Sequence, residues 1–377
     1  MQFRDLQKQY QVLKPQMDAA VSKVLTDANF ISGAQVKSLE KKLADFVGVK
    51  HCITCANGTD ALKLAEMAYG IGSGHAVFVP DFTFFSTAET VAELGATNIF
   101  VDVDMDTFNI CPKALEAAIE KVIAEGKLEP KAIVAVDLFG QPADYPAISA
   151  IAEKYGLILI EDGAQGFGGK IGERMACSFG HIATTSFFPA KPLGCYGDGG
   201  AVFTNDDEAA ALIRSLCIHG KSGEDKYNNI RIGMNSRLDT LQAAVLEVKL
   251  DAFAEYELEA VNRAAGWYNA RLSGAVKTPV VLPGFYSSWA QYTIQLADDG
   301  SRDALQQALK EQDIPTMLYY PRGMHQQGAF AGIPYEGQCP NTEKLCRTVL
   351  ALPMHPYLEE GDVEVICKAI LELAVRN

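Results

Sequence analysis

The chain has 377 residues, of which 48% are hydrophobic and 21% are charged, and its formal net charge is −14. This length and composition are typical of a globular enzyme with a full hydrophobic core and two lobes. Because a nucleic-acid backbone requires a basic protein face, the negative charge argues against nucleic acid as a general partner. A small anionic substrate remains compatible, because a few basic side chains inside a cleft outweigh the overall field there.

The sequence gives no sign of a membrane segment or of a metal site. No apolar run approaches the roughly 18–20 residues that span a bilayer, and the first residues lack the apolar region of a signal peptide. Nine cysteines without a regular framework indicate buried thiols, so we expect a cytoplasmic protein. Cys52 and Cys55 match C-x-x-C, but they lie on an expected strand, where residues three apart face opposite sides, and no second pair completes a zinc site.

The first two thirds of the chain predict helices and strands in alternation. Such alternation indicates βαβ units and a mainly parallel sheet, whose ligands bind at the carboxyl ends of the strands. The expected strands are 52–56, 76–80, 98–102, 132–136, 158–162, 179–186 and 201–204. The expected helices are 7–27, 33–46, 57–67, one that begins near 86, 112–124, 145–155, 209–217 and a long one from about 239.

The pattern changes near residue 250, where we place the boundary between a large domain (1–250) and a small α+β domain (251–377). The long helix continues to about residue 272. After it we expect short strands near Thr278 and at 290–296, a helix at 302–312, an edge strand at 316–319 and a final helix at 361–374.

Three side chains in the stretch from 161 to 204 suggest chemistry. Lys191 lies among aromatic residues, prolines and glycines, with no neighbouring charge in sequence. Such a lysine is either a surface residue with a buried stem or an amine kept for attack on a carbonyl. Asp162, at the end of an expected strand, would suit the pyridinium nitrogen of pyridoxal phosphate, and Ser186 its phosphate.

The sequence of this stretch resembles the signature of the DegT/StrS family of nucleotide-sugar aminotransferases. Family members have an E-D-x-A-Q segment, then S-F-x-x-x-K and a G-D/E-G-G turn, and this chain has Gly163 where many have alanine. The resemblance implies a fold-type-I, pyridoxal-phosphate-dependent aminotransferase. It implies that Lys191 is the catalytic lysine bound to the cofactor, Asp162 the partner of the ring nitrogen, Gln165 a neighbour of the ring hydroxyl and Ser186 a phosphate ligand.

Other positions follow from the same resemblance. Gly58, Thr59 and Asp60 match the family's G-T-x-A-L phosphate segment, although a strand–helix junction with ordinary N-caps has the same pattern. Phe84 corresponds to an aromatic residue that stacks on the cofactor ring, whereas its neighbours fit a core role. Asn235 corresponds to a residue that reaches the partner subunit's cofactor phosphate, which implies a homodimer with shared active sites. Asn235 and its neighbour Ser236 also suit helix caps.

The substrate contacts are expected in a segment whose sequence departs from the family motif. Members often read H-Y-P-x-P-x-H, whereas this chain has Tyr319 for the first histidine and Gly323 for the second proline. We expect Tyr320, Arg322 and His325 to bind substrate.

The segments 186–200, 235–244 and 352–358 resemble most closely the members that act on UDP-2-acetamido-3-keto-hexuronic acid. A uronate carboxylate favours a guanidinium partner, and Arg237 is the candidate, unless it pairs with Asp239 or with the partner chain.

The resemblance implies a two-step transamination. L-glutamate would provide the amino group, a nucleotide-linked 3-ketosugar would accept it, and the product would enter a surface polysaccharide. One alternative is a neutral 3-keto or 4-keto 6-deoxy sugar as acceptor. Two others are a cofactor-dependent dehydratase, which has histidine in place of the lysine, and a non-catalytic regulator of the same fold; Lys191 and its neighbours argue against both.

Overall fold

The computed structural model describes residues 1–222, 227–333 and 338–374. A seven-stranded sheet forms the centre of the larger lobe. β9 runs antiparallel to both of its neighbours, and the other pairs are parallel, as the sequence predicts. The strand order is β1 (His51–Cys55), β9 (Gly200–Thr204), β8 (Ile182–Ser186), β5 (Ile158–Asp162), β4 (Glu129–Val136), β2 (His75–Pro80) and β3 (Thr97–Val101).

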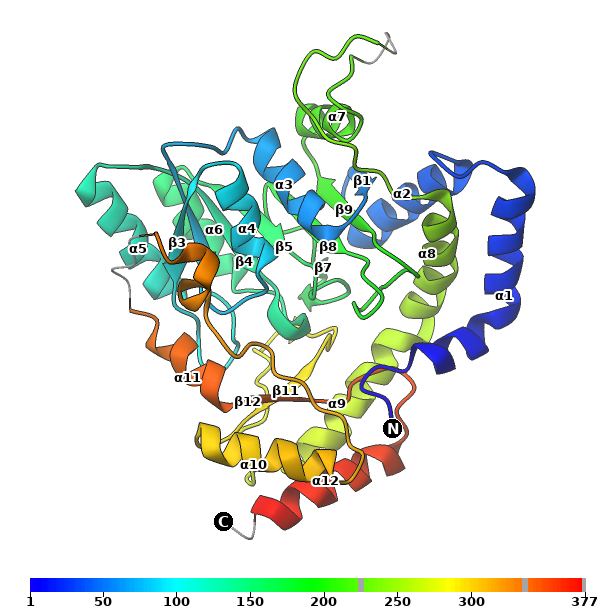
Figure 1. Ribbon diagram of the computed structural model, residues 1–377, viewed down its shortest axis with the longest axis vertical. Coiled ribbons are helices and arrows are strands. Elements are labelled where there is room, and N and C mark those ends of the chain that lie inside the picture. Colours follow the sequence, from blue (N-terminus) through cyan, green and yellow to red (C-terminus); the bar gives the residue numbers. More distant parts are fainter. Residues whose placement is uncertain (223–226, 334–337, 375–377) are drawn as a thin grey trace.

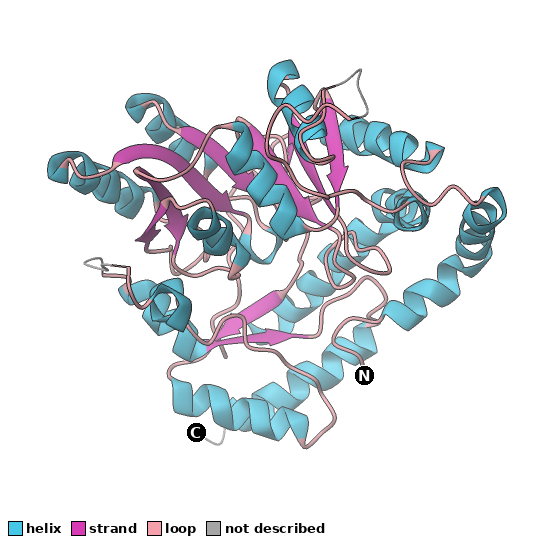
Figure 2. Ribbon diagram, turned by 45° about the horizontal axis from the view of Figure 1, so that its top comes forward, coloured by secondary structure: helices cyan, strands magenta, loops and turns pink. Residues whose placement is uncertain are grey.

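Helices cover both faces of this sheet (Figures 1 and 2). One face carries α3 (Gly58–Ala68), α4 (Ser86–Glu93) and α7 (Asp207–Leu216). The other carries α2 (Ala34–Val47), α5 (Pro112–Glu125), α6 (Tyr145–Tyr155) and α8 (Thr240–Ala252). α1 (Leu6–Asp27) packs outside α8 (Figure 1). None of the described helices is long and apolar enough to cross a membrane.

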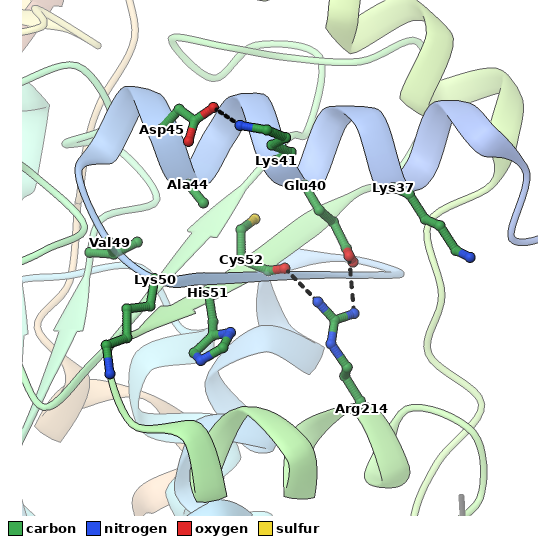
Figure 3. Close-up of a pocket in the computed structure, with 10 residues that line it drawn as sticks. All are labelled: Lys37, Glu40, Lys41, Ala44, Asp45, Val49, Lys50, His51, Cys52 and Arg214. Atoms are coloured by element: carbon green, nitrogen blue, oxygen red, sulfur yellow. Dashed lines mark hydrogen bonds and ion pairs between the residues drawn. The ribbon is translucent and has the colours of Figure 1, made fainter. Parts of the chain in front are cut away.

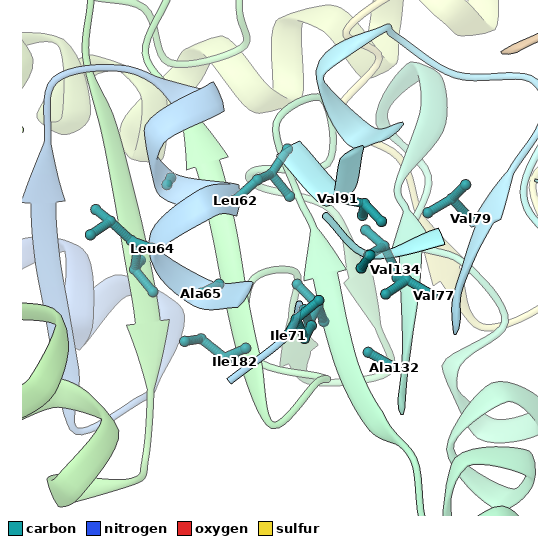
Figure 4. Packing of buried hydrophobic residues seen from close by; sticks show 14 of the residues in the cluster. Leu62, Leu64, Ala65, Ile71, Val77, Val79, Val91, Ala132, Val134 and Ile182 are labelled. Atoms are coloured by element: carbon teal, nitrogen blue, oxygen red, sulfur yellow. The ribbon is translucent and has the colours of Figure 1, made fainter. Parts of the chain in front are cut away.

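The core follows the two-residue period of the strands. Val77 and Val79 of β2 and Val134 of β4 face α3 and α4, where Leu62 and Val91 pack on them (Figure 4). The intervening residues Phe78, Ile133 and Ala135 face α5 and α6 instead. Burial of each large apolar side chain stabilises the fold by about 1.5–3 kcal/mol, so strands buried on both faces are apolar along their length.

The smaller lobe has its own core. α8 continues through a five-residue π-helical turn (Phe253–Glu257) into α9 (Leu258–Leu272). α9, α10 (Asp299–Lys310) and α12 (Glu360–Ala374) pack against a two-stranded sheet of β11 (Tyr292–Gln295) and β12 (Val349–Leu352). The expected boundary near residue 250 thus falls inside a continuous helical rod, and the division at that residue stays a prediction.

Two expected strands are wrong. Near Thr278 the structure has a single bridge between Lys277 and Gln295, and in 316–319 a single bridge between Met317 and Ala351. Both segments flank the two-stranded sheet, but prolines at 279, 315 and 321 interrupt them, and proline cannot donate to a strand ladder.

Several short elements escaped sequence reasoning. They are β12, α11 (Pro340–Thr348), the β6 (Lys170–Ile171)–β7 (Arg174–Met175) hairpin with β10 (Phe285–Tyr286), and 3₁₀ turns at Leu138–Gly140, Met324–Gln326 and Gly328–Phe330.

Candidate active site

Polar side chains gather where the strands of the large sheet end. β5 ends at Asp162, and its parallel neighbour β8 ends at Ser186. β1 points the same way and leads through Asn57 into α3. Because the carboxyl ends of parallel strands lie at one edge of a sheet, these distant segments meet there, as expected for an open α/β fold.

Lys191 and Asp162 are electrostatically coupled at this edge. Lys191 is half-buried in the loop between β8 and β9, and its Nζ is 6.0 Å from the centre of the Phe84 ring. Burial lowers the pKa of the Lys191 amine, and the Asp162 carboxylate raises that pKa in part. Burial raises the pKa of Asp162, against hydrogen bonds from the Ala164 amide (3.2 Å) and the Thr87 hydroxyl (3.0 Å). These surroundings favour a neutral, reactive amine beside one acid.

Gln165 and two aromatic residues continue the site. The Gln165 Oε1 accepts a hydrogen bond from the Phe139 amide at 2.8 Å, and its Nε2 donates to the Tyr320 hydroxyl at 3.0 Å. Burial raises the pKa of Tyr320, so its hydroxyl keeps its proton. The ring of Tyr320 lies 6.4 Å from that of Phe84, which is 54% exposed. The site therefore runs through space from Gln165 to Tyr320, Phe84 and Lys191, and each of these side chains lies beside the next.

The start of α3 lies directly against the end of β8. A Cβ at Gly58 would be 2.6 Å from the Cβ of Ser186, so a larger residue would push the helix away from the strand. The cap of α3 is Asn57, whose side chain accepts from the Asp60 amide at 2.7 Å. The Thr59 hydroxyl instead pairs with that of Ser86 at 2.7 Å. Thr59 and Asp60 are therefore not the side-chain caps of this helix.

The segment that contains Asn235 and Arg237 lies beside the same junction. The Ser236 hydroxyl accepts from the Ala56 amide at 3.0 Å, next to the start of α3. Asp239 is the N-cap residue of α8, so neither Asn235 nor Ser236 caps that helix. Asn235 is exposed. Within the described residues, the side chain of Arg237 makes no hydrogen bond or ion pair, and the alternative pairing with Asp239 does not form there.

Arg322 and His325 have different surroundings. Arg322 is exposed. The Nδ1 of His325 lies 2.6 Å from the Oδ2 of Asp81, and its amide donates to the other Asp81 oxygen at 2.8 Å. Asp81 follows β2 and is fully buried, so His325 is anchored to the same edge of the sheet. The structure thus places His325 in an ion-pair position and leaves Arg322 at the surface.

Sequence reasoning missed two residues of this region. Thr87 donates to Asp162, and its place in the first turn of α4 beside the predicted Phe84 was the available signal. Arg4 donates to the carbonyl oxygens of Lys191 and Pro192 at 2.6 and 3.2 Å. No motif or spacing connects residues 187 positions apart, so the sequence held no signal for Arg4.

A hollow of about 630 Å³ lies between α2 and α7, at the end of β1 that points away from the site (Figure 3). His51, at the start of β1, lines it, whereas the end of that strand leads to the site. Three of its four lysine and arginine side chains have acidic partners, since Arg214 pairs with Glu40 at 3.0 Å, Lys41 with Asp45 at 2.6 Å and Lys50 with Asp207 at 3.6 Å. This hollow therefore has little net attraction for an anion.

The C-x-x-C cysteines are structural in position. Cys52 and Cys55 are both buried, and they pack into clusters on opposite faces of the sheet, as the strand period predicts. The part of the chain that the structure describes contains no group of three or more histidine, cysteine or acidic residues that could hold a metal ion.

The sequence is similar to curated aminotransferases along nearly its whole length. The UDP-2-acetamido-2-deoxy-3-oxo-D-glucuronate aminotransferase of Pseudomonas aeruginosa is 45% identical over 98% of this chain and 99% of the relative. A pleiotropic regulatory protein of Geobacillus stearothermophilus is 43% identical over 98% and 97%. The UDP-N-acetyl-3-dehydro-alpha-D-glucosamine 3-aminotransferase of Acidithiobacillus ferrooxidans is 42% identical over 97% and 96%.

Solved structures agree with the fold. A DegT/DnrJ/EryC1/StrS aminotransferase from Brucella abortus superposes with a TM-score of 0.95 at 51% identity and covers 98% of both chains. NtdA of Bacillus subtilis, solved with the bound cofactor PMP, has a TM-score of 0.87 at 28% identity and covers 99% of this chain and 83% of its own. The family profile matches residues 11–371. The chain thus belongs to the DegT/DnrJ/EryC1/StrS aminotransferase family, and it is a pyridoxal-phosphate-dependent transaminase with the fold-type-I architecture.

Proposed function

We propose that this enzyme transfers an amino group from L-glutamate to a UDP-linked 2-acetamido-3-keto-hexuronic acid, for a surface polysaccharide. The observation that carries the proposal is the coupling of the half-buried Lys191 amine to Asp162 beside the Phe84 ring. The names of the relatives from Pseudomonas aeruginosa and Acidithiobacillus ferrooxidans, both UDP-3-keto-sugar aminotransferases, support the substrate class.

The residues at the sheet edge fit pyridoxal phosphate. When bound, this cofactor supplies a ring that takes up electrons from the reacting carbon. Asp162 would pair with the ring nitrogen, since its buried carboxylate favours a cation opposite it. Thr59, Asp60 and Ser186, where α3 meets β8, would hold the phosphate through hydroxyl and amide groups at a helix N-terminus.

Lys191 would serve twice in the reaction. As a neutral amine it would bind the cofactor covalently, and once displaced by substrate it would move a proton between the substrate carbon and the cofactor carbon. Phe84 would lie on the ring face, while Gln165, fixed by Phe139 and Tyr320, would orient the ring hydroxyl.

The substrate carboxylate would bind Arg237. Its guanidinium is half-buried and has no ionic partner within the described residues, and it lies in the segment that Ser236 ties to the α3 junction. A planar guanidinium binds a carboxylate through two parallel hydrogen bonds. Tyr320, Arg322 and His325 would contribute the remaining contacts, with Arg322 at the mouth.

A homodimer would complete the site. The segment that follows α7 protrudes from the molecule (Figure 1), and Ile230 and Ile232 on it are 54% and 88% exposed. Exposed apolar side chains of this kind mark interaction surfaces. Asn235, exposed at the base of the segment, would then reach the phosphate in the partner's site. Nine free cysteines support a reducing, cytoplasmic setting.

The first test is the absorption spectrum of the purified protein beside Lys191→Ala. We expect a visible cofactor band in the wild type that bleaches with L-glutamate, and no such response in the variant. A wild type without a band after pyridoxal phosphate is supplied would overturn the catalytic reading. A regulator would then be the better description, as the name of the Geobacillus stearothermophilus relative suggests for that protein.

The acceptor is tested separately, with the glutamate-loaded protein. We expect the UDP-3-keto uronate to restore the band faster than neutral 3-keto or 4-keto 6-deoxy sugars, and Arg237→Lys to reduce that preference. Equal rates with the neutral sugars would favour the alternative acceptor.

Shared sites are tested by mixing Lys191→Ala with Asn235→Ala. Mixed dimers hold one intact site, so activity should return on mixing. Two inactive pools that stay inactive after subunit exchange would contradict the shared site.

A further inference from the structure

The loop that carries Lys191 is held by two cations from distant segments, the buried Lys249 and the half-buried Arg4. Arg4 Nη2 donates to the carbonyl oxygens of Lys191 (2.6 Å) and Pro192 (3.2 Å). Lys249 Nζ donates to the carbonyl oxygen of Gly194 at 2.5 Å. The loop is also tightly folded, since a Cβ at Gly194 would be 2.5 Å from the Pro189 oxygen. Three peptide oxygens within four residues thus receive charge-assisted hydrogen bonds.

The two cations come from segments that are far apart in the sequence. Lys249 is 1% exposed in α8, where its ammonium also lies 4.7 Å from the Tyr196 ring centre. Arg4 lies before α1, in an N-terminal segment whose residue Phe3 accepts from the Met354 amide of the smaller lobe at 3.2 Å. Arg4 therefore connects the smaller lobe to the loop, at the place where Figure 1 shows the N-terminus beside that lobe.

These charges are poorly neutralised. Burial lowers the pKa of Arg4 to about 10 and that of Lys249 to about 8, and Glu257 raises both values in part. Glu257 is 3% exposed and is already bonded to Gln9 (2.9 Å) and the Tyr357 hydroxyl (2.6 Å). One shared carboxylate offsets only part of the desolvation cost of these two cations, so their hydrogen bonds to the loop oxygens supply much of the remaining compensation.

We propose that Arg4 and Lys249 are positioning residues, which hold the peptide oxygens of the 191–194 loop and thereby fix where the Lys191 amine is presented. The inference rests on the proposed role of Lys191 in binding the cofactor. A second consequence concerns charge: Arg4 lowers the pKa of the Lys191 amine, so it opposes Asp162 and favours the neutral form. Lys249 would act on position alone.

Hydrogen exchange of the full-length protein tests the positioning role without relying on activity. We expect amides within 187–199, including those of Lys191 and Cys195, to exchange about tenfold faster in Arg4→Met and in Lys249→Met. The exposed Lys8→Met, one turn into α1, is the matched control and should leave these amides unchanged. Wild-type exchange of the loop in both folded variants would overturn the inference. Arg4→Gln replaces Arg4→Met if the latter does not fold.

The charge effect is tested by the pH dependence of Lys191 acetylation in protein from which bound cofactor has been removed, followed by peptide mass spectrometry. Removal of the Arg4 charge should move the midpoint for Lys191 upward by about half a pH unit or more, while Arg4→Lys, which keeps the charge, should leave it in place. An unchanged midpoint in Arg4→Met would overturn this part.

These readouts also separate the two proposals. If the loop loosens in the variants but Lys191 of the wild type never binds pyridoxal phosphate, the proposed function is refuted and the positioning role of Arg4 and Lys249 still holds.

Discussion

Two consecutive residues of β5 present their carboxyl groups to opposite faces of the sheet, and their surroundings differ. Asp162 faces α4, where Thr87 donates to it and Lys191 provides a positive charge. Glu161 faces the α6 side, where its neighbour is another carboxyl, that of Asp137. Both acids are buried, so burial raises the pKa of each. The partners then act differently: the charge of Lys191 lowers the pKa of Asp162 in part, whereas Glu161 raises the pKa of Asp137 further and itself accepts a hydrogen bond from Asp137 that lowers its own pKa in part.

The acid pair behind the site favours a shared proton, because burial raises the pKa of both carboxyls. Asp137 accepts from the Ala143 amide (3.0 Å) and the Tyr145 hydroxyl (2.8 Å) through Oδ1, whereas its buried Oδ2 has no donor among the described residues. Glu161 accepts from the amides of Cys177 and Phe179. A proton between the two carboxyls gives the Asp137 Oδ2 its partner and removes one of two like charges.

The largest effect is expected from Asp162→Asn, which removes the charge opposite Lys191 and leaves the shape of the side chain. We expect a loss of about 10²–10³-fold in the glutamate half-reaction, measured by the decay of the visible band, because a preorganised charge at the reacting group is removed. Glu161→Gln is the matched control on the same strand and should stay within about threefold of the wild type. Equal losses in the two variants would contradict the distinction between the two acids.

The next effect concerns stability and its dependence on pH. The pKa of Glu161 is raised from an ordinary 4.5 to about 7, so between these values the folded protein binds more protons than the unfolded chain. The stability contributed by protonation of Glu161 is therefore full below pH 4.5 and is lost as the pH rises through about 7.

Asp137→Asn should reduce this loss, because the amide can donate to Glu161 and carries no like charge. We expect the variant to gain about 1–3 kcal/mol relative to the wild type at pH 8, from urea unfolding, and little at pH 5. An equal change at both pH values would indicate an altered packing contact instead of a relieved charge pair.

Glu161 and Asp162 also show how much of the site could be predicted from the sequence. The alternation of strands and helices predicted the parallel sheet and the position of Asp162 at its edge, since both follow from local pattern. The E-D dipeptide also predicts that the two carboxyls face opposite sides. That Glu161 meets Asp137 depends on the pairing of β4 with β5, in which Ala135 lies opposite Glu161. Such register is a tertiary property, and no local spacing specifies it.

The same reasoning applies to the smaller lobe and to Arg4. The strands expected near Thr278 and at 316–319 had suitable residues, but prolines reduced each to a single bridge. Arg4 reaches Lys191 only because the N-terminal segment docks on the smaller lobe. The residues that sequence motifs identified lie near strand ends. The residues that hydrogen-bond to them, such as Arg4, come from remote parts of the chain.

A smaller effect is expected from Thr87→Val, which removes the hydroxyl donor to Asp162 and keeps a side chain of similar shape. A hydrogen bond to a charged group contributes about 1.5 kcal/mol, so activity should fall about tenfold. This bond lowers the pKa of Asp162, and its loss should move the acid limb of the pH–rate profile upward. Thr83→Val is the control, because the Thr83 hydroxyl pairs with Thr87 at 3.0 Å. A profile that moves equally in both variants would place the effect in the threonine pair, not in Asp162.

The smallest effect is expected from Tyr320→Phe. This change removes the hydroxyl that accepts from Gln165 Nε2, but Gln165 keeps its bond from the Phe139 amide, and the ring still packs near Phe82 at 6.0 Å. A neutral hydrogen bond contributes about 0.5–1.5 kcal/mol, and because Gln165 keeps its other bond we expect the lower end of that range, about a two- to threefold loss in the glutamate half-reaction. A loss above a hundredfold would mean that the Tyr320 hydroxyl contacts the reacting groups directly. Gln165 keeps one of its two hydrogen bonds in this variant, so a change in its orientation cannot account for so large an effect.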